Sequence, residues 1–418
     1  MNLAATAVVN ENRTLKARLN PEVLSSSILI VDDQEINLDF MSAMLADVGF
    51  SNIRLARDGL SALELIEADP PDLLILDVMM PIMSGIDLCK HLRRDPRLAE
   101  LPVLVQTGLS TVHDRIEIFG AGATDLILKP INGLELISRV SLHVERKLLI
   151  EGLTRSRDRL ATELSAARDL QFDLLPSAQE QSALLQRFGL DLASTFSPSS
   201  ELGGDMWGLL QRSDGGIGVF IADFAGHGVQ AAMNTFRLHT LLQDVRQLPG
   251  RPGELLTDLN RRLRHLLPVG QFATMTCAAI DPRRQTLSWA SAGSPPPLLK
   301  LDGEDWKDLA SAGLPLGIDD STAYETHETA FPAGAALVLY SDALSETPTS
   351  SGERLEDQGV RNLLRGSEGE SNSQAALSTV LAKFQAMLSG PLCDDLTTII
   401  IRNQIHRLGE ERPRDAAE

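Results

Sequence analysis

The chain has 418 residues, 43% of them hydrophobic and 23% charged, and it is longer than the roughly 250–300 residues at which a single core stops growing, so we expect several domains. Its formal net charge of −19 disfavours binding to nucleic-acid phosphates, which requires clustered Lys and Arg, so we expect no direct contact with nucleic acid. No run reaches the roughly 18 apolar residues of a membrane span, so we expect a soluble chain without a membrane partner.

Residues 1–26 are expected to form an N-terminal tail outside the first domain. The short apolar patch in this tail has no basic region before it and no convincing cleavage site, so it is not interpreted as a signal peptide. Cys89, Cys277 and Cys393 are widely separated and odd in number, which argues against a disulfide framework and against a zinc site. We therefore expect a protein of the reducing cytoplasm.

Residues 27–147 alternate between short apolar strands and amphipathic helices. The strand segments include ILIV, LLIL, PVLV and LIL, which are apolar throughout. Continuous apolar strands between amphipathic helices are typical of a parallel sheet with helices on both faces. We predict a doubly wound, flavodoxin-like α/β domain whose ligand site lies beyond the C-terminal ends of the strands.

Five polar residues fall directly after these strands, where a parallel sheet would bring them to one edge. Asp33 and Asp77 could bind Mg²⁺ together with a backbone carbonyl, because this ion prefers oxygen ligands. A lysine and a hydroxyl group at the same edge would stabilise the charge of a phosphoryl group on Asp77. One acid at a strand end is often only a solvated loop residue, but five polar residues at matching ends favour a site. The five residues are Asp32, Asp33, Asp77, Thr107 and Lys129.

The motifs VDD, LDVMMPIMSG, QTG and LKP resemble those of a two-component receiver domain. The resemblance implies that Asp77 accepts a phosphoryl group from a histidine kinase or another phosphodonor, and that Thr107 and Lys129 bind this group. The family usually has an aromatic residue three positions before the lysine, whereas this chain has Leu126. The phosphorylation signal is therefore expected to leave through the last helix. The implied Mg²⁺ ligands are Asp32, Asp33, Asp77 and the backbone carbonyl of Met79.

Residues 148–176 are predicted to continue that last helix as a linker, which Pro176 ends. A seam of mostly apolar residues with spacings of four and three, including two successive fours at Leu160, resembles a coiled coil with a stutter and predicts a homodimer. A single amphipathic helix packed on its own domain is an equally good interpretation of this pattern. The seam consists of Leu149, Leu153, Ser156, Leu160, Leu164, Ala167, Gln171 and Leu174.

Residues 177–404 contain strand-like segments separated by glycine-rich turns and by two helical blocks, at 229–245 and 253–267. Clustered strands with inserted helices indicate an α/β sandwich of two antiparallel sheets with flanking helices. The polar residues 405–418 are expected to be a solvated tail.

Acidic residues occupy four turns of this region, each expected to follow a strand. Carboxylates that converge from separate strands repel one another unless cations lie between them, and a site of oxygen ligands favours Mg²⁺ or Mn²⁺. Two such ions would clamp a phosphate ester and activate a water molecule. Taken alone, each of these acids is better interpreted as a turn former or a helix cap. The acids are Asp205, Asp223, Asp342 and the pair Asp394 and Asp395.

The segment from about residue 171 to residue 402 is similar to the metal-dependent, PP2C-like serine/threonine phosphatases. The similarity is greatest to the branch with the sporulation phosphatase SpoIIE and the stress-response phosphatases of partner-switching pathways. It is carried by DLQFDLLP, GGD, DFAGHG, LPLGI, YSDALSE and CDDLT. It implies that Asp223 bridges two Mn²⁺ or Mg²⁺ ions, with Asp342 and Asp394 on the first ion. The other implied site residues are Asp205 near the second ion, the carbonyl of Phe224 and, ranked lower, Gly204, Gly226 and Asp395.

Three positions depart from the phosphatase pattern. Gly208 stands where the family often has a second acid, Ser294 replaces a histidine, and Ala343 replaces a glycine. None of these changes removes a predicted metal-binding side chain. His227 lacks partner histidines at ligand spacing, so Asp223, and not His227, is predicted to bind metal.

The sequence thus predicts a response regulator whose receiver domain controls the dephosphorylation of another protein. By resemblance, the substrate is a phosphorylated anti-sigma-factor antagonist. The alternative is a catalytically weak or inactive phosphatase fold that binds or sequesters a sigma factor or another regulatory partner. The complete set of aspartates favours the enzyme. A DNA-binding regulator is disfavoured, because we find no helix-turn-helix with a basic recognition helix.

Overall fold

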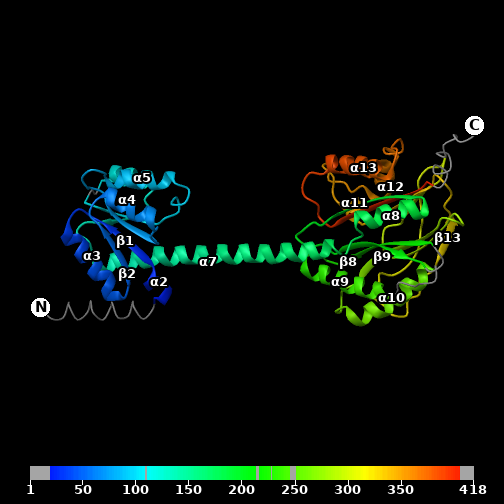
Figure 1. Cartoon of the computed structure of the whole chain (residues 1–418), viewed down its shortest axis with the longest axis horizontal. Helices are drawn as coiled ribbons and strands as arrows, with labels where there is room; N and C mark the ends of the chain where they lie inside the picture. The colour runs from blue at the N-terminus through cyan, green and yellow to red at the C-terminus, as the bar shows by residue number, and fades with distance from the viewer. Residues whose placement is uncertain (1–18, 109–110, 213–215, 227, 245–250, 405–418) are drawn as a thin grey trace, which may run out of the picture. The chain divides into compact units, whose positions relative to one another are not determined.

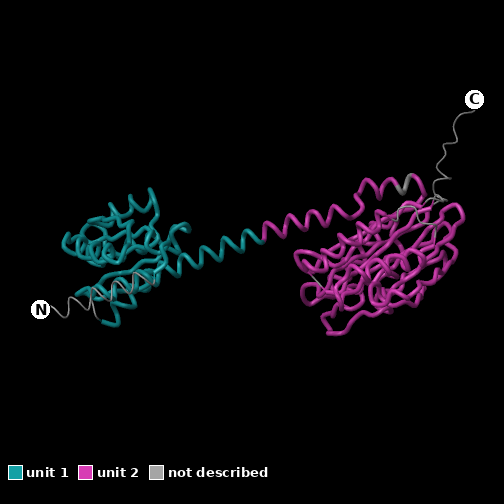
Figure 2. The backbone as a smooth tube through the Cα atoms, turned by 90° about the horizontal axis from the view of Figure 1, so that it is seen from below, with its two compact units in different colours: residues 1–160 teal, residues 161–418 magenta. Residues whose placement is uncertain are grey.

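The computed structural model describes residues 19–108, 111–212, 216–226, 228–244 and 251–404. The chain divides into two compact units, residues 1–160 and residues 161–418 (Figure 2). Most of the predicted N-terminal tail and all of the predicted C-terminal tail lie outside the described residues. Within the described residues, every helix is too short or too polar to cross a lipid bilayer.

The first unit contains a parallel sheet of five strands in the order β2-β1-β3-β4-β5. This confirms the predicted doubly wound fold. The strands are β1 (Ser27–Val31), β2 (Asn52–Ala56), β3 (Leu73–Asp77), β4 (Val103–Thr107) and β5 (Asp125–Leu128). The helices around the sheet are α2 (Pro21–Ser25), α3 (Glu35–Val48), α4 (Gly59–Ala68), α5 (Gly85–Arg94), α6 (Val112–Gly120) and the start of α7 (Gly133–Phe172).

Hydrophobic clusters cover both faces of this sheet, because β1, β3 and β4 are buried along their whole length. Alternate residues of each strand point to opposite faces, so a strand that is apolar throughout can fill two cores. One core contains side chains of α3 and α7, and the other contains side chains of α4, α5 and α6.

Helix α7 is 40 residues long and runs from the first unit into the second (Figure 1). Its first turns pack Leu136, Val140 and Val144 into the core of the first unit. Two ion pairs hold the same stretch, since Arg139 lies 2.6 Å from Asp125 and Lys147 lies 2.6 Å from Asp72. The helix then continues through most of residues 148–176 and ends at Phe172, four residues before the predicted stop at Pro176.

The second unit contains two sheets of five strands, in the orders β13-β10-β9-β8-β7 and β12-β11-β14-β15-β6. All of the strand pairs are antiparallel, which confirms the predicted α/β sandwich. The first sheet consists of β7 (Asp205–Gln211), β8 (Ile217–Phe224), β9 (Ala273–Asp281), β10 (Thr286–Ala292) and β13 (His327–Ala330). The second consists of β6 (Leu190–Ser197), β11 (Leu298–Lys300), β12 (Lys307–Asp308), β14 (Ala336–Tyr340) and β15 (Leu396–Asn403).

Three hydrophobic clusters build this sandwich. The central cluster joins side chains of both sheets, such as Trp207 and Ile221 from one and Leu337 and Ile401 from the other. The outer clusters pack helices against the two outer faces (Figure 1). Those helices are α9 (Val229–Asp244) and α10 (Pro252–Leu266) on one face, and α11 (Ala343–Glu346), α12 (Glu356–Arg365) and α13 (Ser373–Met387) on the other.

Candidate functional site

The C-terminal edge of the parallel sheet carries a compact group of charged side chains. Lys129, which follows β5, places its ammonium nitrogen 2.8 Å from Oδ2 of Asp77 and 3.2 Å from Oδ2 of Asp32. Asp77 is the last residue of β3, and Asp32 follows β1. Both carboxylates are buried, so the lysine offsets charges that water does not screen.

Oxygen ligands for a divalent cation are present at this edge. One carboxylate oxygen from each of Asp32, Asp33 and Asp77 lies within 4.8 Å of the other two. Asp32 is held in place by the backbone N–H of Gln34 at 2.9 Å and by the side-chain amide of Asn37 at 3.0 Å. Burial raises the pKa of Asp77, and the hydrogen bond and charge of Lys129 oppose this effect only in part. Three close oxygens with one exposed carboxylate suit Mg²⁺, which keeps several water ligands.

The remaining predicted receiver residues flank this group. Thr107 is the buried last residue of β4, and its carbonyl accepts a hydrogen bond from the backbone N–H of Lys129 at 2.9 Å. The backbone N–H of Met79 lies 3.5 Å from Oδ1 of Asp77. Leu126 is half-buried within β5. The structure therefore brings all of the predicted receiver residues to one edge.

In the second unit, Asp205 and Asp223 face each other across two neighbouring strands. They are paired in the register of β7 and β8, so their side chains lie on the same face of the sheet. One oxygen of Asp205, Oδ2, accepts a hydrogen bond from the hydroxyl of Thr397 at 2.6 Å. Its other oxygen, Oδ1, is buried and has no hydrogen-bond partner among the described residues. A buried carboxylate oxygen without a partner is costly unless a cation binds it.

The other acids come from the second sheet, and their places correct one expectation. Asp342 follows β14 as predicted, but Asp394 and Asp395 precede β15, and Asp205 begins β7. In an antiparallel sheet, the start of one strand lies beside the end of its neighbour. Residues on both sides of a strand can therefore reach the same edge.

The charges at this edge are crowded. Burial and the charges of Asp342, Asp394 and Asp395 raise the pKa of Asp223 to about 7. Burial and the charge of Asp394 raise the pKa of Asp342 to about 6. The pKa of Asp205 is raised well above its usual value by burial and by the charge of Asp223. Carboxylates that disfavour one another's ionised form, together with the partnerless oxygen of Asp205, fit divalent cations with oxygen ligands.

Glycines bring the backbone close to these acids. The carbonyl of Gly204 accepts a hydrogen bond from the N–H of Phe224 at 3.2 Å, and a Cβ atom on Gly204 would lie 2.8 Å from the Phe224 carbonyl oxygen. Gly226 has a φ of 98°, which favours glycine. His227 lies outside the described residues.

The structure gives a physical reason for one departure from the family pattern. A Cβ atom on Gly208 would lie 2.5 Å from Cε1 of Phe220, so an acid at this position would clash with the neighbouring strand. Ala343 is buried as the first residue of α11, and Ser294 is half-buried. Neither substitution displaces the acids described above.

Gln171 belongs to the motif DLQFDLLP but was not predicted to take part in the site. Gln171 lies near the end of α7 and is buried in the second unit. Its Nε2 donates to the carbonyl of Gly203 at 2.6 Å, and its Oε1 accepts from the N–H of Gly203 at 3.1 Å. Phe172 packs edge to face on Phe196 with ring centroids 5.2 Å apart. The long helix thus touches the segment that leads into Asp205.

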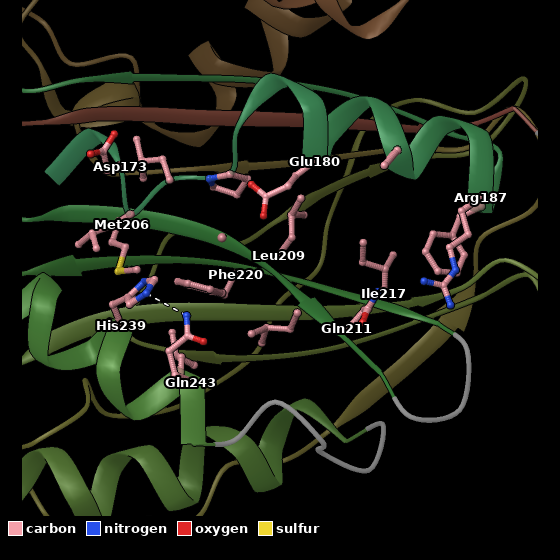
Figure 3. A pocket seen from close by; sticks show the side chains of 18 residues that line it. Asp173, Glu180, Arg187, Met206, Leu209, Gln211, Ile217, Phe220, His239 and Gln243 are labelled. Carbon is pink, nitrogen blue, oxygen red and sulfur yellow. Dashed lines mark hydrogen bonds between the residues drawn. The ribbon is translucent and has the colours of Figure 1, made fainter. Parts of the chain in front are cut away.

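A cavity of about 700 Å³ lies beside the free edge of β7 (Figure 3). Its walls come from α8 (Ala178–Phe188), β7, β8 and α9, and His239 and Gln243 are joined by a 2.9 Å hydrogen bond in its floor. The residues known to line this cavity include Gly208. They do not include Asp205, Asp223, Asp342, Asp394 or Asp395. The cavity is therefore distinct from the acidic site.

Comparison with known proteins identifies both units. Residues 28–141 match the model of the response regulator receiver domain, and residues 213–404 match that of Stage II sporulation protein E (SpoIIE). The chain is 38% identical over 130 residues to the response regulator PleD of Caulobacter vibrioides, covering 31% of this chain and 28% of PleD. It is 35% identical over 167 residues to the response regulator MprA of Mycobacterium bovis, covering 40% of this chain and 67% of MprA. The chain thus spans less than a third of the length of PleD.

The fold of the second unit has a counterpart among solved structures. The SiaA-PP2C domain of Pseudomonas aeruginosa superposes with a TM-score of 0.52 at 22% identity, covering 59% of this chain and 98% of that domain. The protein is a response regulator, with an N-terminal receiver domain and a C-terminal SpoIIE-type domain of PP2C fold. Asp205 and Gln171 lie before the range matched by the SpoIIE model.

Proposed function

We propose that the receiver domain, when phosphorylated on Asp77, controls a metal-dependent protein serine/threonine phosphatase in the second unit. We assign the receiver to residues 27–147, a helical linker to 148–176 and the phosphatase to 177–404. The observation that carries the proposal is the convergence of acids from four chain segments, with raised pKa values for three of them and one buried oxygen without a described partner. Such a site is stable when cations occupy it.

The phosphatase residues have separate tasks in this proposal. Asp223, Asp342 and Asp394 would hold the first of two Mn²⁺ or Mg²⁺ ions, and Asp223 and Asp205 would hold the second. When bound, the ions supply a water of lowered pKa and a clamp on the phosphate ester. The carbonyl of Phe224 is a further ligand, and Gly204 and Gly226 shape the backbone beside the acids.

The receiver residues act on the phosphoryl group. Asp77 accepts it from a histidine kinase or another phosphodonor, and Lys129 moves its hydrogen bond from the Asp77 carboxylate to the new phosphoryl oxygens. Thr107 offers a hydroxyl at the end of β4. Asp32, Asp33, Asp77 and the carbonyl of Met79 would hold Mg²⁺, which would neutralise charge on the phosphoryl group.

We infer that α7 transmits the signal. The helix is anchored in the receiver core by its first turns and contacts Gly203 through Gln171. Between these ends, Leu149, Leu153 and Leu160 expose 73%, 74% and 56% of their surface. These exposed leucines favour a homodimer through the linker over an isolated amphipathic helix, because in a single helix they would remain in contact with water.

We propose a phosphorylated anti-sigma-factor antagonist in the cytoplasm as the substrate, so that its dephosphorylation alters transcription indirectly. The support for this class of substrate is the relationship to the SpoIIE family. The acidic net charge of −19 agrees with a protein substrate rather than direct binding to DNA.

The test is Mn²⁺-dependent release of phosphate from a phosphoserine protein by the full chain, with and without a small-molecule phosphodonor. We expect Asp342→Asn to lower the rate on the order of a hundredfold or more, because loss of a ligand exceeds the effect of a residue that only orients one. Asp77→Asn should keep a basal rate but lose the response to the phosphodonor. Asp302→Asn, which changes an exposed acid, serves as the matched control. If the wild type releases no phosphate in either state, the chain is a binding module and not a phosphatase.

A further inference from the structure

We propose that Asp395 is a positioning residue that holds the Gly203–Gly204 turn and aligns the three acid-bearing segments around it, instead of binding metal. The inference rests on the proposed metal-dependent site, and it separates two neighbouring acids that the sequence motif presents as a pair. In this proposal Asp394 binds metal, whereas Asp395 holds the backbone of the segments that carry the metal ligands.

The carboxylate of Asp395 already has its hydrogen-bond partners. Its Oδ1 accepts from the backbone N–H of Ser199 at 2.6 Å and from the Ser199 hydroxyl at 3.0 Å. Its Oδ2 accepts from the backbone N–H of Gly204 at 2.5 Å. The residue is 1% exposed, so these three donors replace water around a buried charge. A carboxylate has about four acceptor positions, and three of them point into the protein here.

The turn that Asp395 contacts leaves no room for side chains. A Cβ atom on Gly203 would lie 2.9 Å from Oδ2 of Asp395 and 3.1 Å from Cζ of Phe196. The next residue, Gly204, is bonded to Asp395 through its N–H and to Phe224 through its carbonyl. The residue after that is Asp205, so the orientation of its carboxylate depends on this turn.

The backbone of Asp395 contacts the other two segments. Its N–H donates to Oδ1 of Asp394 at 2.8 Å. Its carbonyl accepts from the hydroxyl of Ser341 at 2.9 Å, and Ser341 directly precedes Asp342. One residue therefore joins the segments of Asp205, Asp342 and Asp394.

A positioning residue and a metal ligand can be told apart by how their substitution changes the stability of the metal-free protein. Replacing Asp394 by Asn removes repulsion between the acids and keeps a carbonyl oxygen that can still accept from the backbone N–H of Asp395. Replacing Asp395 by Asn sets an NH₂ group against the backbone N–H of Ser199 or of Gly204, which then loses its acceptor. The two substitutions should move the stability of the metal-free protein in opposite directions.

The experiment compares Asp395→Asn with Asp394→Asn in the metal-free full chain. For Asp395→Asn we expect the unfolding temperature of the second unit to fall by about 5 °C and amide hydrogen exchange at Gly204 to accelerate by about tenfold or more. Asp394→Asn should leave the exchange of Gly204 unchanged and should not lower the unfolding temperature. Equal or higher stability of Asp395→Asn, with Gly204 still protected, would overturn the proposal.

Ser199→Ala provides a milder second test, because it removes only one donor to Asp395. In a double-mutant cycle, we expect Ser199→Ala to accelerate exchange at Gly204 in the wild-type background and to have little effect in Asp395→Asn. Fully additive effects would contradict the proposal. None of these measurements uses metal or substrate, so they separate a failure of this inference from a failure of the proposed phosphatase activity.

Discussion

Asp223 and Asp342 are held in surroundings that favour their protonated form. Burial and neighbouring carboxylates raise their pKa values to about 7 and about 6, from a usual value of 3.8. A carboxyl whose pKa is higher in the folded chain contributes stability that is fully present below pH 3.8 and is lost as the pH rises through the folded pKa. For these two acids the loss is completed between about pH 6 and pH 8.

We therefore expect the metal-free second unit to become less stable between about pH 4 and pH 8, and Mn²⁺ to raise its unfolding temperature most at the upper end of this range. Bound Mn²⁺ replaces the protons that the crowded acids otherwise need. Calorimetry at several pH values, with and without Mn²⁺, measures both trends. Asp342→Asn should flatten the metal-free pH dependence, whereas Asp302→Asn should keep it. A slope that is the same in Asp342→Asn and in the wild type would rule out this assignment.

Among the elements, α7 has two sections of different character. Its first turns bury Leu136, Val140 and Val144 and carry the ion pair of Lys147 with Asp72. Beyond these turns Leu149, Leu153 and Leu160 of the predicted seam are exposed. The end of the predicted seam is not, because Gln171 is buried and Leu174 packs against the core of the second unit. Tertiary packing accounts for the first section, whereas the exposed leucines of the second section are available to pack against another helix.

We expect Leu153→Glu and Leu160→Glu to convert a dimer into a monomer, because each introduces a charge into the seam. Sedimentation of the full chain across micromolar concentrations measures the change. Thr154→Glu adds the same charge at an exposed position beside the seam and should leave the dimer intact. A wild type that stays monomeric throughout would refute the homodimer, and so would a seam variant that stays dimeric.

Helix α8 and strand β7 were not predicted from the sequence, and each has an identifiable local cause. Helix α8 begins after Ser177, which exchanges hydrogen bonds with Glu180 at 2.8 Å and 3.2 Å in the arrangement of a capping box. This spacing is visible in the sequence and would have located the helix. Strand β7 was not predicted, because residues 205–208 at its start are all buried and so lack the polar alternation of a half-exposed strand.

At the scale of the whole molecule, the receiver and the phosphatase fold share one helix. The end of that helix reaches the second unit through Gln171, which bonds to both backbone groups of Gly203 and lies 3.3 Å from the Thr235 hydroxyl. A shift of the helix would therefore move the turn before Asp205. Such a shift between two packings is a known form of switching.

We expect Gln171→Ala to uncouple the two units, so that the phosphodonor changes the rate of phosphate release by less than about twofold while both units stay folded. Phosphate release with and without the phosphodonor measures the coupling. Gln181→Ala is the matched control, because that glutamine bonds to the backbone of Pro176 at the same junction without touching the acidic site. If the phosphodonor changes the rate of phosphate release by Gln171→Ala as much as that of the wild type, the signal takes another route.

The sequence by itself determined the two fold classes, the long helix and the identity of most candidate site residues. These features depend on local patterns: apolar strands alternating with amphipathic helices, the absence of proline from residues 133–172, and short motifs that contain Asp77, Lys129, Asp223 and Asp342. Such patterns extend over only a few consecutive residues, so they are visible in the sequence.

Only the tertiary structure decided how these residues face one another. The pairing of Asp205 with Asp223, the raised pKa values, the clash that keeps an acid from position 208 and the contact of Gln171 with Gly203 all join distant segments. The same holds for Asp394 and Asp395, which are neighbours in the chain but have different surroundings. Strand register and burial arise from packing across the sandwich, and no local pattern contains them.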